Sequence, residues 1–76
     1  MSRYLSEARH YARQIQHYYE HGGAKGYTAS FSFFQELGAL MQRADRSKRG
    51  KSDVPLIHAI YKKMTGLMEK MEIRSG

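Results

Sequence analysis

The chain has 76 residues and no cysteine, which leaves room for one small domain and excludes disulfides and thiolate metal sites. Lys and Arg outnumber Asp and Glu by 13 to 7, and the net charge of +6 favours acidic partners such as nucleic acid or an acidic protein surface. No secretory signal and no membrane span of roughly 20 apolar residues is evident, so we expect a single cytoplasmic helical domain over residues 1–76 with no membrane partner.

The first predicted element is a helix over about residues 3–21. An apolar face with helical spacing supports it, formed by Tyr4, Ala8, Tyr11, Ile15 and Tyr18. Ser2 can cap its start, and Gly22 and Gly23 can end it, because glycine adopts the left-handed conformation common after helices. The three tyrosines recur every seven residues, and their amphipathic rings favour a half-buried interface, within the fold or in a homodimer.

This helix ends in HYYEH, residues 17–21, a pattern that supplies two zinc ligands and a general base in one class of metalloproteases. His17 and His21 would stand one turn apart and could chelate a metal ion. However, the pattern directly precedes two glycines at a helix end, and the later acidic residues form no motif for a third ligand. We interpret the segment as a helix ending, predict no catalysis and no cofactor, and keep the histidine pair as an alternative metal hypothesis.

The middle of the chain allows two interpretations. In YTASFSF, apolar and polar residues alternate, which is typical of a strand, but no second strand is evident to pair with it. A helical spacing also fits the residues that follow, and Ser32 with Gln35 forms a capping-box pattern. We predict an extended segment at 27–31 followed by a helix over about 32–46; a strand here would pair with its copy in a homodimer.

A third helix is predicted over about residues 55–73. Asp53 or Ser52 can cap it, and Pro55 suits its first turn, where a missing N–H costs no hydrogen bond. Its apolar face comprises Ile57, Ile60, Tyr61, Met64, Leu67, Met68 and Met71. The result is an all-α fold of three helices, and its many large apolar residues leave some exposed, which favours a homodimer.

The clearest functional signal is the sequence QRADRSKRGKSD, residues 42–53, which we call the basic segment. Its five cations can contact phosphates: Arg43, Arg46, Lys48, Arg49 and Lys51. Lys62 and Lys63 on the third helix can extend this surface. The sequence RGKS is not a P-loop, because Asp45 stands where that motif needs its first glycine.

A DNA-binding helix-turn-helix is a poor match, since its turn has only about 3–4 residues and this linker is longer. The chain also has no Asn and few well-placed base-reading side chains. Any nucleic-acid contact is therefore expected at the backbone, with weak sequence preference.

Two functions fit these features. The first is a small non-enzymatic accessory protein that binds nucleic acid through the basic segment, mainly by phosphate contacts. The alternative is an adaptor or inhibitor of the mobile-element type, with the basic segment steering it toward an acidic protein surface. It would dock a larger protein through Tyr and Met residues: Tyr4, Tyr11, Tyr18, Met64, Met68 and Met71.

Overall fold

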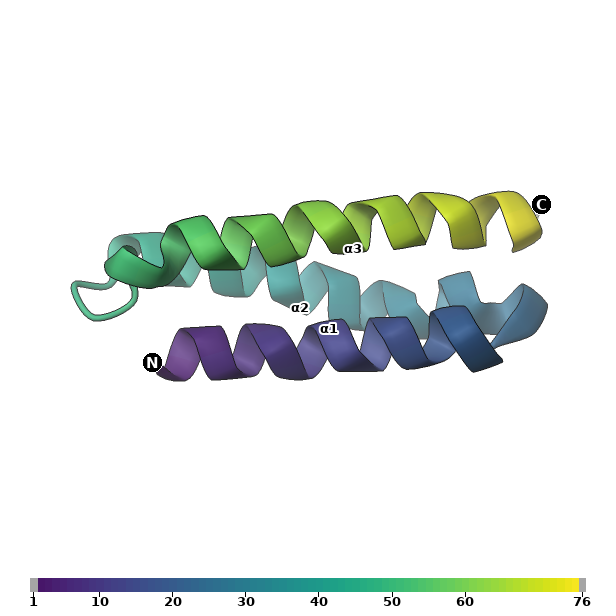
Figure 1. The fold of residues 1–76 in the computed structure, drawn as a ribbon, viewed down its shortest axis with the longest axis horizontal. Coiled ribbons are helices and arrows are strands. Elements are labelled where there is room, and N and C mark those ends of the chain that lie inside the picture. Colours follow the sequence, from purple (N-terminus) through teal and green to yellow (C-terminus); the bar gives the residue numbers. More distant parts are fainter. Residues whose placement is uncertain (1, 76) are drawn as a thin grey trace.

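A computed structural model describes residues 2–75 as a bundle of three α-helices, with no strand in that range (Figure 1). Helix α1 spans Arg3–His21, α2 spans Gly26–Arg46 and α3 spans Val54–Ser75. The three helices confirm the predicted all-α fold. Within the described residues, no helix is both long and apolar enough to cross a membrane.

The helices alternate in direction, so α1 and α3 run parallel and α2 runs antiparallel to both (Figure 1). Short 3-10 turns lie between them: η1 (Gly23–Lys25) before α2 and η2 (Lys51–Asp53) before α3. The bundle is elongated, with extents of 40 × 16 × 15 Å. Because the number of helices is odd, the start of α1 and the end of α3 lie at opposite ends of the bundle.

Ten buried apolar side chains from all three helices form the core: Leu5, Ala8, Ile15, Leu37, Leu40, Ala44, Ile57, Met64, Met68 and Met71. Each large one contributes about 1.5–3 kcal/mol by leaving water. Aromatic rings pack around this core, and the closest pair is Phe34 with Tyr61, stacked at 4.9 Å between α2 and α3. The periodic apolar faces of the sequence are thus the surfaces along which the helices meet.

The start of α2 differs from the sequence prediction. Residues 27–31, predicted to be extended, are helical, and α2 begins at Gly26 rather than near residue 32. An isolated strand leaves its backbone groups without partners, whereas a helix satisfies its own, so without a second strand the helix is favoured. The capping-box pattern at Ser32 lies inside α2 and caps nothing; η1 leads into the helix without a side-chain cap.

Glycine makes the sharp turn between α1 and α2 possible. Gly22 follows α1, and its N–H donates to the Tyr18 carbonyl oxygen at 2.8 Å. Gly23 has φ of +56°, the left-handed region that disfavours other residues. A Cβ on Gly26 would lie 2.8 Å from the Tyr18 carbonyl oxygen and 3.1 Å from Met71 Sδ. The predicted helix ending is confirmed, and a glycine at the start of α2 lets all three helices approach closely.

Candidate nucleic-acid interface

The basic segment lies at the end of the bundle that also holds the start of α1 (Figure 1). After α2 ends at Arg46, the chain turns compactly rather than as an open loop. The Lys51 N–H donates to the Ser47 carbonyl oxygen at 2.9 Å, and the Asp53 N–H donates to the Gly50 carbonyl oxygen at 3.0 Å. These local hydrogen bonds hold the cations of the turn on a defined frame.

Gly50 fixes this turn against two helices. It is buried, and a Cβ at this position would lie 2.7 Å from Tyr4 Cδ2 and 3.0 Å from Ala44 Cα. Only a residue without a side chain allows so close an approach. The half-buried Tyr4 ring therefore covers the inner side of the turn, while Lys48 and Arg49 remain exposed beside it.

A hydrogen bond also ties the turn to the start of α1. The Ser2 amide donates to Asp53 Oδ2 at 3.0 Å, across 51 positions of sequence. The Ser2 hydroxyl accepts from the Leu5 amide at 3.2 Å, which confirms the predicted helix cap. Hydrogen bonding from the Ser2 side chain, and then from its amide, lowers the pKa of the Asp53 carboxyl below its ordinary value, and the Arg9 charge adds to this.

Replacing Asp53 with Asn is expected to make the fold less stable at neutral pH. A carboxyl whose pKa is lowered by folding stabilises the folded state at pH values above its ordinary pKa of about 4, and this contribution is lost as the pH falls below that value through the lowered pKa of the folded state. The difference in urea midpoint between the wild type and Asp53→Asn should therefore be largest at pH 6–7 and shrink as the pH falls below about 4. Asp45→Asn is the matched control, because Asp45 is exposed at the end of α2 and accepts no hydrogen bond among the described residues. A constant difference from pH 7 to about pH 3 would contradict the role given to the Asp53 charge.

All seven cations that the sequence assigned to the interface are exposed: Arg43, Arg46, Lys48, Arg49, Lys51, Lys62 and Lys63. The first two lie in the last turn of α2, and the next three belong to the turn and η2. Lys62 and Lys63 lie further along α3, about 12 Å from its start. The structure thus brings five of the seven together at one end and places the other two along the side of the bundle.

Dividing each helix at its midpoint shows that the charge is segregated. The half that contains the turn, residues 3–12 and 37–64, carries nine Lys and Arg residues against three Asp and Glu residues. The other half, residues 13–36 and 65–75, carries four of each, and we call it the neutral half. The entire net charge of +6 therefore lies in the first half, which we call the basic half. The N-termini of α1 and α3 also lie there, and their positive partial charges together exceed the negative partial charge of the α2 C-terminus at the same end.

Two cations of the basic half were missed in the sequence prediction. Arg3 and Arg9 are distant from the basic segment along the chain, but α1 starts beside the turn. Arg3 is exposed and its Nε lies 3.3 Å from Glu7 Oε1, an exposed ion pair that contributes little to stability. The signal that could have found both was topology, since three consecutive antiparallel helices place the start of the first beside the second connection.

The histidine pair lies in the last turn of α1. His17 and His21 are exposed, with ring centroids 5.0 Å apart. Glu20, the acidic residue of the pattern, accepts a hydrogen bond from Gln16 Nε2 at 3.1 Å. Within residues 2–75, no cluster of three or more His, Cys, Asp or Glu side chains has the arrangement that could hold a metal ion. The pair offers two ligands at a helix end, and nothing in the described chain adds a third.

The tyrosines and methionines proposed as a docking face pack mainly inside the bundle. Tyr11 and Tyr18 are half-buried, and their rings lie 6.4 and 6.2 Å from that of Phe33 on α2. Three methionines are nearly inaccessible, with exposed fractions of 3%, 5% and 0%: Met64, Met68 and Met71. These three methionines are therefore part of the core, and Met64 also lines a groove between α1 and α3.

No protein-family model, curated protein sequence or solved structure compared with this chain matches it. Functional inference therefore rests on the residues and their arrangement.

Proposed function

We propose that the protein binds nucleic acid through its basic half, mainly by contacts between Lys or Arg and backbone phosphates. The observation that carries the proposal is the segregation of charge: nine cations against three acidic residues in one half, and four against four in the other. A surface that neutralises phosphates releases bound counterions, which supplies most of the free energy of non-specific binding. The compact turn at Gly50 and the last turn of α2 support the proposal, because together they present five cations from a fixed frame rather than a disordered tail.

The shape of the bundle favours backbone contacts over base reading. Helices α2 and α3 run side by side and antiparallel (Figure 1), unlike a helix-turn-helix, which crosses at about 90–120°. The cross-section of 16 × 15 Å is wider than a major groove of about 12 Å. The end of the bundle can therefore rest on phosphates at both edges of a groove without inserting a helix. We expect little preference for sequence.

Binding of the purified protein to labelled duplex DNA and to single-stranded RNA across a salt series tests this proposal. If four cations each neutralise one phosphate of duplex DNA, the affinity should fall about 150-fold between 50 and 200 mM salt. Fluorescence anisotropy measures this dependence, and the slope of log affinity against log salt gives the number of phosphates. An affinity that hardly changes with salt, or no binding at low salt, would contradict the proposal.

We retain two further expectations from the sequence as part of this proposal. A chain without cysteine that binds nucleic acid suits the reducing cytoplasm. The homodimer has less support, because the described chain exposes only three large apolar side chains: Phe31, Leu56 and Ile73. Leu56 and Ile73 lie at opposite ends of α3 and so do not form one patch. Sedimentation equilibrium will distinguish monomer from dimer.

A further inference from the structure

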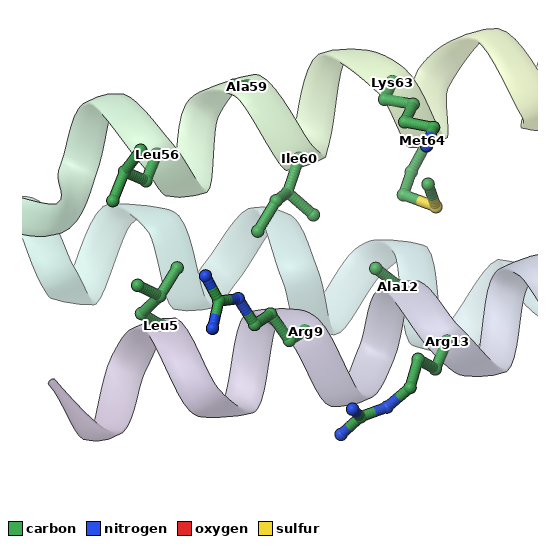
Figure 2. A pocket seen from close by; sticks show the side chains of 9 residues that line it. All are labelled: Leu5, Arg9, Ala12, Arg13, Leu56, Ala59, Ile60, Lys63 and Met64. Atoms are coloured by element: carbon green, nitrogen blue, oxygen red, sulfur yellow. The ribbon is translucent and has the colours of Figure 1, made fainter. Parts of the chain in front are cut away.

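A shallow groove of about 500 Å³ runs between α1 and α3 (Figure 2). Its floor is apolar and comes from both helices: Leu5, Ala12, Leu56, Ile60 and Met64. Leu56 is 53% exposed, although it points from α3 toward α1 over this groove (Figure 2). An exposed leucine in a row of aliphatic side chains costs free energy in water and gains it when a partner covers the groove.

The groove is bordered by cations and by no acidic side chain. Arg9 reaches from α1 toward α3, Arg13 extends along the outer side of α1, and Lys63 lies on α3 (Figure 2). None of the residues that line the groove is Asp or Glu. An apolar floor with a purely cationic border is complementary to a segment that presents aliphatic side chains flanked by carboxylates.

We propose that this groove binds an acidic amphipathic helix of a partner protein. Leu56, Ile60 and Lys63 line the groove from one face of α3, at spacings of four and three residues. A partner helix presents its own anchor residues at the same spacing. The proposal does not rest on nucleic-acid binding at the turn, which lies at the end of the bundle, although Arg9 and Lys63 of the groove also belong to the basic half.

Two other occupants fit less well. A second copy related by a two-fold axis would place the same three cations opposite themselves, and each copy brings a charge of +6. Phosphates could pair with the cations of the border, but a nucleic acid has no aliphatic surface to cover the floor, and the residues that line the groove include no aromatic side chain on which a base could stack. The charge complementarity therefore selects an acidic peptide helix.

The probe is a fluorescein-labelled synthetic helix of about 18 residues, with Leu at every third or fourth position and Glu beside them. A control peptide, the basic twin, has the same sequence with Lys in place of each Glu. Anisotropy with the full chain should show binding of the acidic helix at least about tenfold tighter than that of the basic twin. Leu56→Ser should weaken binding of the acidic helix about tenfold, and Lys63→Glu should weaken it about fivefold.

Matched variants on the same helix control for non-specific effects. Ile73→Ser removes an apolar side chain that is 79% exposed outside the groove, and Lys70→Glu reverses a charge that does not line it. Both should bind the acidic helix like the wild type. Equal affinity for the two helices, or equal effects of Leu56→Ser and Ile73→Ser, would overturn the proposal.

The remaining outcomes identify the other occupants and would also overturn the proposal. A wild-type dimer that becomes a monomer in Leu56→Ser would assign the groove to a second copy. Loss of oligonucleotide binding in Leu56→Ser, with the fold intact by circular dichroism, would assign it to nucleic acid.

Discussion

Reversing Arg46 and Arg49 to Glu should weaken binding to duplex DNA about a hundredfold at low salt and leave the helical content unchanged. Both side chains are exposed beside the compact turn, so the substitutions remove two phosphate contacts and introduce two repulsive charges without disturbing the core. The slope of log affinity against log salt should decrease by about 2. Anisotropy titrations at several salt concentrations, with circular dichroism to check the fold, measure both quantities.

A control with the same net charge distinguishes a local interface from general attraction. Lys25→Glu with Lys70→Glu changes the charge of the chain by the same amount, but both residues belong to the neutral half. This control should bind DNA only a few-fold more weakly than the wild type, because long-range attraction is screened beyond about 10 Å. If the two double variants lose affinity equally, then binding follows total charge and the basic half is not an interface.

Leu37→Ala is expected to produce the largest loss of stability of the substitutions considered. Leu37 lies near the middle of α2 and is fully buried in the core shared by the three helices. Truncating it removes apolar contacts and leaves a cavity, at a cost of about 2–5 kcal/mol. For a domain of this size the free energy of unfolding is about 5–10 kcal/mol, so the variant should lose about half of it. Urea denaturation followed by circular dichroism gives the value.

Leu56→Ala makes the same chemical change at a position that is 53% exposed, and it should cost about 0.5 kcal/mol or less. A comparable loss at both positions would mean that Leu37 is not a core residue of the folded chain in solution. The small expected cost at Leu56 also means that its substitutions can test the α1–α3 groove without unfolding the protein.

The helices could be predicted because their signals are local. The cap at Ser2, the glycines after His21 and the proline near the start of α3 each act within one or two turns, and the apolar periodicity defines the buried faces. The start of α2 could not be predicted in the same way. Alternation in YTASFSF is compatible with a strand, and the choice depended on whether any other segment could pair with it.

The interface was only partly predictable for a similar reason. The basic segment is continuous in sequence, so its cations were evident, whereas Arg3 and Arg9 join it only through the packing of α1 beside the turn. The methionines illustrate the opposite case. Their helical spacing is the same for a core face and a docking face, and only the burial of Met71 and its neighbours against α1 and α2 distinguishes the two.

The odd number of helices has a practical consequence for work on this protein. The start of α1 adjoins the cations of the turn, while α3 ends about 40 Å away at the electrically neutral end. A tag or fluorophore fused before α1 would therefore sit against the proposed phosphate-binding surface, and one fused after α3 would point away from it. Attachment to a sensor surface through the end of α3 leaves the charged end facing the solution, in the orientation that a nucleic acid must approach.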